Sequence, residues 1–368
     1  MSFNKRLADN ATAAADSQFK VLLFTGNRNA ASNNSQSITG VGFEPGMVWA
    51  KVRALANPFY TTFGFVAANQ VRGTQKFLDF QIANGETTAS NSLTSFDADG
   101  FTVGAYGNWN GGLPGQNLAM VSYNFKKGTD FSNNTDGDIT TSGNYNAELG
   151  LSIVNWTGSG SGTAAIGHNM NGAPEMIIMK NLSSNSTNYR VFSTANASGK
   201  SNSMPTGEAE YDFGWSVNST TFSSTPSITN GQTSANQSII AFCFKSVAGQ
   251  TAVGAYDGSG SDVTINLGFK PSFVLIKNVK KTSQYVVFDD QREGALFLNE
   301  ASAEVNGINS SHANNPGGGN IGGMPVQSGA PPDEFIQFTD TGMVIKQNDT
   351  QQVLQSGSDK RYSYLAIK

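Results

Sequence analysis

Side chains able to carry out catalysis or bind a transition metal are scarce in this sequence. It holds two histidines, His168 and His312, and a single cysteine, Cys243. Three such side chains are too few for a zinc site at their spacing, and no HExxH, CxxC or nucleophile-elbow pattern occurs. We expect no catalytic residue and no metal centre of this kind. Both histidines are predicted to be exposed loop residues, and Cys243, in the apolar run 240–244, a buried thiol.

Acidic turns offer a second kind of chemistry. Asp97 and Asp99 form one candidate cluster, and Asp130, Asp136 and Asp138 form another. Calcium takes six to eight oxygen ligands, which loops rich in Asp and Asn can supply, although neither stretch has the EF-hand spacing. Calcium therefore stays open as a cofactor. Glycoside cleavage would need two carboxylates that meet in space, which sequence spacing does not reveal.

Two aromatic residues close to these turns could contact a ligand. Trp109 lies in GNWNG (107–111) and has no apolar neighbour in the sequence, so it is the aromatic residue for which exposure is most expected, with core packing as the alternative. Tyr106 lies three residues earlier, and amphipathic aromatic side chains are common at binding surfaces. Trp109, Tyr106, Asp97 and Asp99 are the predicted ligand-binding or partner-binding residues.

The composition indicates strands rather than helices. Only 14% of the 368 residues are charged, 41 are glycine, and 38% are hydrophobic. Gly, Asn, Ser and Thr favour turns over helices, while the apolar content is enough to form a core. A net charge of -4 argues against a nucleic-acid-binding face. No apolar stretch approaches the roughly 20 residues of a membrane span, and residues 1–8 lack the apolar core of a signal peptide, so we expect synthesis in a cytoplasm.

The elements that must position these residues recur along the chain. GFEPGMVWAK (42–51), GAPEMIIMK (172–180) and GFKPSFVLIK (268–277) each place a Lys six residues after a Pro. Because Pro cannot donate a ladder hydrogen bond, it belongs before a strand or at its first residue. The nearly continuous apolar run that follows predicts a strand covered on both faces. The lysine is expected to lead the chain into solvent.

Further matches occur in the same order. Each copy opens with an apolar stretch, an aromatic residue, Thr or Asp, and Gly, at residues 21–26, 153–158 and 253–258. Each closes with an alternating strand pattern ending in Lys, at residues 121–126, 240–245 and 363–368. A hairpin-type turn at residues 96–103 matches residues 338–345. We therefore predict an all-β protein of three tandem, diverged, jelly-roll-like β-sandwich units.

The repeats divide the chain into segments. Residues 129–148 have no apolar periodicity and are interpreted as a linker, and a Gly/Pro-rich insertion near 309–332 as a long surface loop or a partner-contacting arm. The predicted segments are an N-terminal arm at 1–17, repeat 1 at 18–128, the linker at 129–148, repeat 2 at 149–249, and repeat 3 at 250–368.

Several of these motifs also point to a family. The decamer at 42–51, VRG at 71–73 and LTSFDADGFTVG at 93–104 resemble virion proteins of tailed phages, especially those of marine bacteria and cyanobacteria. The repeats of that group look like concanavalin-type jelly rolls. The likeness extends over copy one and residues 268–288, whereas copy two lacks the VRG and DGF elements. It implies a structural or adhesive role on the particle and supplies no catalytic residues to carry over.

These observations favour a non-enzymatic virion structural protein, with a tail-fibre or receptor-binding component as the leading interpretation. Its expected partners are other virion proteins and a host-surface glycan, and edge strands buried between copies would make it a homo-oligomer. A capsid decoration or head fibre is the first alternative. A carbohydrate-active enzyme on a β-sandwich scaffold and a plain carbohydrate-binding module are alternatives from other classes.

Overall fold

The described part of the chain consists of strands and turns and contains no helix, so the all-β, sandwich-like prediction is confirmed. Among the described residues there is no helix long and apolar enough to cross a membrane. The predicted N-terminal arm up to residue 16, the insertion near 309–332 and His312 lie outside the described residues. The computed structural model describes residues 17–368 except 29–33, 54–62, 112–116, 161, 225–234, 293, 301–303, 305–335 and 347–359.

The first unit, as we call strands β1 to β9, contains one large and one small antiparallel sheet. Their orders are β1-β9-β3-β4-β5-β6 and β2-β8-β7. The small sheet contains the predicted turn, because Asp97 pairs with Gly100 between β7 and β8. The strands are β1 (Phe19–Thr25), β2 (Gln36–Thr39), β3 (Pro45–Val52), β4 (Val66–Asn69), β5 (Lys76–Asp79), β6 (Thr87–Thr88), β7 (Leu93–Asp97), β8 (Gly100–Val103) and β9 (Ala119–Lys126).

The second unit, β10 to β20, repeats this plan with two extra strands. Its sheets have the orders β10-β11-β12-β20-β14-β15-β16-β17 and β13-β19-β18. The strands are β10 (Thr129–Asn134), β11 (Thr141–Asn146), β12 (Leu151–Thr157), β13 (Ile166–Gly167), β14 (Met176–Asn181), β15 (Tyr189–Ser193), β16 (Lys200–Met204), β17 (Tyr211–Asp212), β18 (Ser216–Val217), β19 (Thr221–Ser223) and β20 (Ser238–Phe244).

The extra strands correct the interpretation of residues 129–148 as a linker. They form the hairpin of β10 and β11, and β11 pairs with β12 from Ser142↔Asn155 to Asn146↔Leu151. The apolar periodicity is weak because the outer strand β10 is mostly exposed and polar. Backbone pairing to a neighbouring strand stabilises this segment without a hydrophobic stripe of its own.

The third unit, β21 to β28, has the same plan in its simplest form. Its sheets have the orders β21-β28-β23-β24-β25 and β22-β27-β26. The strands are β21 (Thr251–Asp257), β22 (Val263–Asn266), β23 (Phe273–Asn278), β24 (Val286–Asp289), β25 (Leu296–Phe297), β26 (Ile336–Thr339), β27 (Gly342–Ile345) and β28 (Arg361–Ile367).

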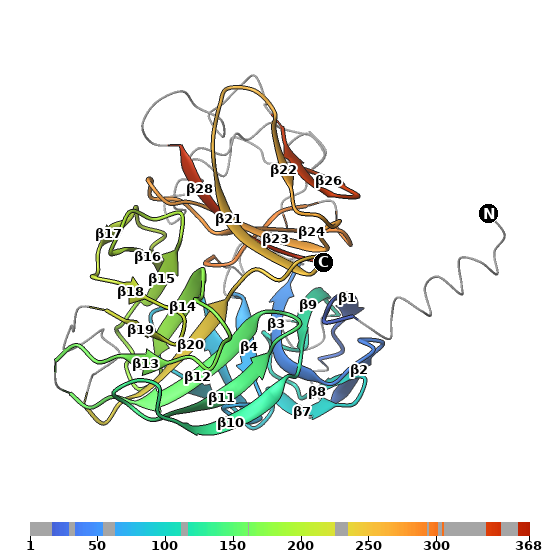
Figure 1. Cartoon of the computed structure of the whole chain (residues 1–368). Helices are drawn as coiled ribbons and strands as arrows, with labels where there is room; N and C mark the ends of the chain where they lie inside the picture. The colour runs from blue at the N-terminus through green and yellow to red at the C-terminus, as the bar shows by residue number, and fades with distance from the viewer. Residues whose placement is uncertain are drawn as a thin grey trace.

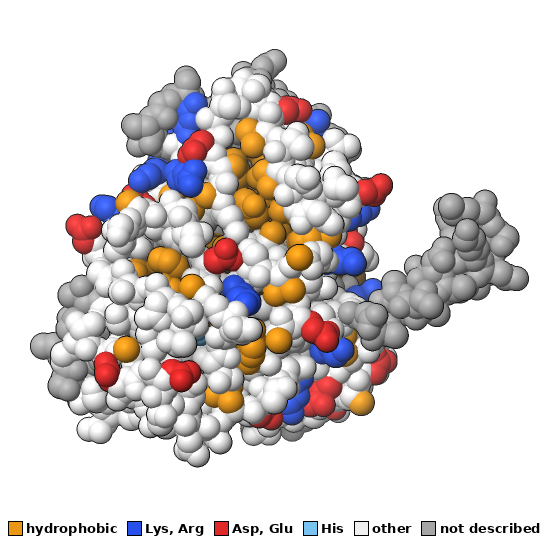
Figure 2. Space-filling view, viewed as in Figure 1, with side chains coloured by type: hydrophobic (Ala, Val, Ile, Leu, Met, Phe, Trp, Pro, Cys, Tyr) orange, Lys and Arg blue, Asp and Glu red, His pale blue; other side chains and the backbone are white. Residues whose placement is uncertain are grey.

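The same pairing scheme therefore occurs in all three units. The opening strand pairs with the closing strand, and the closing strand pairs with the Pro-led strand: β1-β9-β3, β12-β20-β14 and β21-β28-β23. Each large sheet also shares an apolar core with its own small sheet. In the third unit several side chains of this core are only partly buried, and Figure 2 shows hydrophobic side chains at the surface between β21 and β22.

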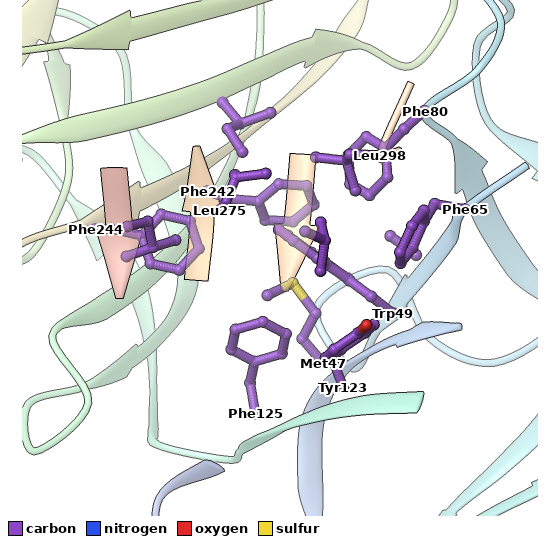
Figure 3. Close-up of a cluster of buried hydrophobic side chains, with 14 of the residues drawn as sticks. Met47, Trp49, Phe65, Phe80, Tyr123, Phe125, Phe242, Phe244, Leu275 and Leu298 are labelled. Atoms are coloured by element: carbon purple, nitrogen blue, oxygen red, sulfur yellow. The ribbon is translucent and has the colours of Figure 1, made fainter. Parts of the chain in front are cut away.

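A central core joins the units. The three Pro-led strands are buried along their whole length, as predicted for strands covered on both faces. In β3, Met47 and Trp49 point to the centre of the molecule, whereas Val48 and Ala50 point to the small sheet. Figure 1 shows the units grouped around this centre, and Figure 3 shows side chains from all three of them meeting there.

Candidate functional site

The expectation that Trp109 is exposed is wrong. Its exposed fraction is 0%, and its ring lies 6.2 Å from that of Phe77 in β5. Tyr106 is half-buried and contacts the same Phe77 ring at 5.1 Å. The sequence around Trp109 offers no apolar neighbour, but the fold brings apolar neighbours from other strands, which the local pattern does not reveal.

The other tryptophans are buried as well. Trp49, Trp156 and Trp215 have exposed fractions of 0%, 2% and 6%. Trp49 lies in the central core, and the other two lie in the outer core of the second unit. Because the sequence contains four tryptophans in all, none of them offers an exposed ring for stacking on a sugar.

Asp97 and Asp99 stabilise the first unit's small sheet. Asp97 accepts hydrogen bonds from the hydroxyls of Ser95 at 2.8 Å and Thr102 at 2.7 Å. Asp99 is exposed and accepts from the backbone N–H groups of Gly40 and Gly42. The two carboxylates thus fix the turns between β7 and β8 and between β2 and β3.

The second acidic cluster is also engaged in local hydrogen bonds. Asp130 accepts from the Asn144 amide at 2.6 Å, Asp136 from the Asn134 amide at 2.8 Å, and Asp138 from the Ala165 backbone N–H at 2.8 Å. Throughout the described residues, no three His, Cys, Asp or Glu side chains come together in a group that could hold a metal ion.

His168 is buried, which corrects its prediction as an exposed residue. Its Nδ1 accepts from the Met170 backbone N–H at 3.1 Å, so Nε2 carries the proton and donates to Asn218 O at 3.2 Å. Burial, the largest effect, lowers the pKa of His168. Cys243 is fully buried in β20, as predicted, and burial raises the pKa of its thiol.

The repeated lysines form the most unusual group of polar side chains. Lys51, Lys180 and Lys277 have exposed fractions of 0%, 1% and 2%, so the prediction that they lead the chain into solvent is wrong. A buried ammonium group needs oxygen acceptors within the protein, and each of these lysines has at least two.

Each ammonium group is held by backbone and hydroxyl oxygens. Lys51 Nζ donates to Phe63 O at 2.6 Å and Glu300 O at 2.9 Å. Lys180 Nζ donates to Ala83 O at 2.7 Å and to Thr187 O. Two of the three lysines thereby reach another unit: Lys51 bonds the third unit, and Lys180 bonds the first.

Lys277 differs because its acceptors lie within its own unit. Its Nζ donates to Asn278 O at 2.6 Å, Lys281 O at 2.8 Å and the Ser283 hydroxyl at 2.7 Å. Ser283 in turn donates its backbone N–H to Gly207 O of the second unit at 2.8 Å. The third lysine is therefore linked to its neighbouring unit through one intermediate residue.

The environments of the three ammonium groups are also alike. Each lies over an aromatic ring at the start of the following strand or directly before it, with Nζ 5.8 Å from the Phe65 ring centroid, 5.0 Å from that of Tyr189 and 5.6 Å from that of Tyr285. Burial is the largest effect on each lysine and lowers its pKa to about 7.

Three glutamates complete the contacts between units. The backbone N–H of Glu86 donates to Leu182 O at 2.8 Å, that of Glu210 to Val279 O at 2.7 Å, and that of Glu304 to Arg53 O at 2.7 Å. Each acceptor lies two residues after one of the buried lysines. We call the three hydrogen bonds the glutamate contacts. They run in a cycle from the first unit to the second, from the second to the third, and from the third to the first.

The richest of these boundaries joins the first and third units. Arg292 donates from Nε to Asp289 at 2.6 Å and from a terminal nitrogen to the Tyr123 hydroxyl at 3.0 Å, while its other terminal nitrogen lies 3.5 Å from Glu304. The Tyr123 hydroxyl donates to Asp289 at 2.7 Å. Glu304 also pairs with Arg53 at 2.7 Å. We call these five residues the arginine network.

This arrangement suits cohesion rather than catalysis. The side chains of Arg292 and Asp289 are both 0% exposed, and that of Glu304 is 8% exposed. Asp289 and Glu304, which share Arg292, therefore do not line an open cleft where a polysaccharide could lie between them. Buried charges that are paired with each other restrict how the units can pack.

The chain matches a family along almost its whole length. Residues 14–366 match the family described as "Domain of unknown function (DUF7483)". The chain belongs to this family. Because the match covers all three units, the family is defined over the whole body and not over a single unit. No curated protein and no solved structure matches the chain.

Proposed function

We propose that this member of the DUF7483 family is a structural component of a tailed-phage particle, and that it serves in a tail fibre as part of the receptor-binding apparatus. The observation that carries the proposal is the union of three sandwich-like units into one body. They share a central core, and the glutamate contacts close a cycle of hydrogen bonds around it.

Such a body is suited to mechanical work on the outside of a particle. Its units do not hang on flexible linkers, because each contributes strands to the same core and backbone groups to the next unit. Closely packed interfaces of this kind resist deformation and transmit strain. A protein that transmits or resists force between a particle and its surroundings needs this property.

The sequence resemblance supports the same proposal, and several residues of the shared motifs make structural contacts in this protein. The motifs that resemble phage virion proteins include Lys51, Arg72 and Asp99. Lys51 bonds the third unit, Arg72 pairs with Glu86 at 3.0 Å, and Asp99 holds two backbone N–H groups. The shared motif is thus a set of structural contacts, which fits proteins related by architecture.

Recognition of a host glycan would have to use residues other than tryptophan, since all four are buried. Asparagine, serine and threonine side chains on the loops supply donors and acceptors suited to sugar hydroxyls. The alternative role as a capsid decoration or head fibre needs no glycan contact. Both roles share the structural proposal and differ in the position on the particle.

Immunogold labelling of purified virions from the phage that carries the gene tests the proposal. We expect label on the tail tips. Label over the head would replace the tail-fibre role with a capsid decoration or head fibre. Intact virions without label, together with absence of the chain from their protein profile, would overturn the structural proposal altogether.

A further inference from the structure

The opening strand is the last strand of the large sheet in the first and third units, but not in the second unit. In the second unit, β12 is followed by β11 and β10. In the first unit, β1 is the last strand, and no described strand pairs with its outer edge. Figure 1 shows β1 at the margin of the first unit.

The outer edge of β1 can be identified residue by residue. At the two ends of its pairing with β9, Lys126 N donates to Gln18 O and Gly26 N donates to Leu118 O, both at 2.9 Å. Residues alternate in direction along an antiparallel ladder, so even-numbered residues of β1 face β9. The backbone N–H and C=O groups of Val21 and Leu23 therefore point away from the sheet.

The ends of this edge are already occupied by side chains. The Ser17 hydroxyl donates to Phe19 O at 2.6 Å, and the Gln36 amide donates to Thr25 O at 2.9 Å. Between them lies Leu23, which at 37% is the one large hydrophobic side chain that is exposed among the described residues. Unpaired backbone groups beside an exposed leucine form a template for another strand.

The second unit shows what such an edge accepts. Ile153 and Asn155 of β12 correspond to Val21 and Leu23 in the repeat. They pair with Asn144 and Ser142 of β11 in antiparallel register. The same position of the same fold thus carries an antiparallel strand in the second unit and no described strand in the first.

We propose that the outer edge of β1 docks a second copy of this chain, with the two β1 strands antiparallel about a twofold axis. A strand edge of this kind is complementary to itself, as an isologous interface requires. Pairing Val21 with Leu23 of the copy would cover the exposed leucine. It would also place Lys20 opposite Phe24 of the copy, so that the only charged residues of the strands do not face each other.

The docked dimer joins two six-stranded sheets into one continuous sheet. This proposal does not depend on the position of the protein on a particle. The outer edge of β21 in the third unit serves as a reference, because β21 is also the last strand of its sheet. At this edge, Val247 pairs with Thr251, and the Ser246 hydroxyl accepts a hydrogen bond from the Val253 backbone N–H. Part of that edge is therefore already covered by the chain itself.

Light scattering after size-exclusion chromatography of the full chain tests the proposal. We expect a concentration-dependent mass twice the 38.8 kDa of one chain. Leu23→Pro removes an N–H that points to the partner and spares the bonds to β9, so this variant should be monomeric with its circular dichroism unchanged. Ala255→Pro, at the corresponding position of β21, should remain dimeric.

A second variant and a second measurement guard against a folding defect. Leu23→Lys keeps the backbone donor but places a charge at the interface, and it should raise the dissociation constant at least tenfold. Hydrogen exchange of the Val21 and Leu23 amides should slow as protein concentration rises. A wild-type chain that is monomeric at every concentration, or a dimer unaffected by Leu23→Pro and Leu23→Lys, would overturn the proposal.

Discussion

The boundary between the first and third units differs from that between the second and third. Both use a glutamate contact, from Glu304 to Arg53 O and from Glu210 to Val279 O. At the first boundary, Glu304 also meets Arg292, whose side chain is 0% exposed. At the second, Glu210 meets Lys280, whose side chain is 31% exposed.

The two boundaries share the same kind of backbone hydrogen bond, but the ion pairs beside it differ in how far they are exposed to solvent. A charge that is entirely removed from water must be matched by partners, and losing one partner leaves the others uncompensated. An ion pair that is open to solvent contributes little, because water and salt screen it. The boundaries should therefore respond differently when their charges are removed.

Removal of Arg292 should have the largest effect on this comparison. Arg292→Ala leaves the Asp289 carboxylate buried with only the Tyr123 hydroxyl from the arginine network, and we expect a loss of about 3–5 kcal/mol in the free energy of unfolding. Urea unfolding followed by tryptophan fluorescence measures it. Arg361→Ala removes an exposed pair with Asp257 and should cost less than about 1 kcal/mol. Equal losses in the two variants would show that the network is not a major source of stability.

The pH dependence of stability sharpens the comparison within one unit. Burial lowers the pKa of Lys277 from 10.5 to about 7, so between these values the unfolded chain binds more protons and stability rises with pH. Lys277→Met should reduce this slope by up to about 1.4 kcal/mol per pH unit. Lys277 is suited to the test because its ammonium bonds only to its own unit.

Urea midpoints between pH 7 and 9 provide the measurement for Lys277→Met. The matched control is Lys200→Met, since Lys200 forms a solvent-exposed pair with Asp212 at 3.5 Å. This variant shows how far the loss of a lysine from the surface alters the slope by itself. If Lys277→Met keeps the full slope, the buried lysine retains its proton throughout this range and the prediction fails.

The smallest effect is expected at the boundary between the second and third units. Glu210→Gln keeps the backbone contact to Val279 O but removes the charge that faces Lys280 and leaves one oxygen for the hydrogen bonds from Lys280, Ala197 N–H and Asn196, so we expect a loss of about 1 kcal/mol. High salt should reduce the difference between this variant and the unsubstituted chain. Thermal unfolding at low and high salt measures both quantities, and a loss comparable to that of Arg292→Ala would remove the contrast between the boundaries.

Repetition in the sequence predicted the strand framework well. The Pro-to-Lys runs form β3, β14 and β23, and the closing patterns form β9, β20 and β28. These predictions succeed because burial on both faces demands a continuous apolar run, which is visible locally. The hairpin of β10 and β11 was missed because backbone pairing holds it, with little apolar burial in β10.

The site could be predicted only in part. The regular spacing identified Lys51, Lys180 and Lys277 as equivalent, but a lysine at the end of an apolar run reads as a solvent-facing residue. Two of their acceptors lie far away in sequence, Glu300 for Lys51 and Ala83 for Lys180. The glutamate contacts have no local pattern either, since Glu86, Glu210 and Glu304 are defined by partners in another unit.

The cyclic order of the glutamate contacts has a consequence for synthesis. Arg53 and Glu304 are 251 residues apart, so Arg53 leaves the ribosome long before its partner exists. At about 5–20 residues per second, the delay is roughly 10–50 s. During that interval the inner face of the first unit's large sheet lacks the third unit that covers it. The nascent chain therefore completes its core late, and a chaperone that shields this face would raise the yield of folded protein.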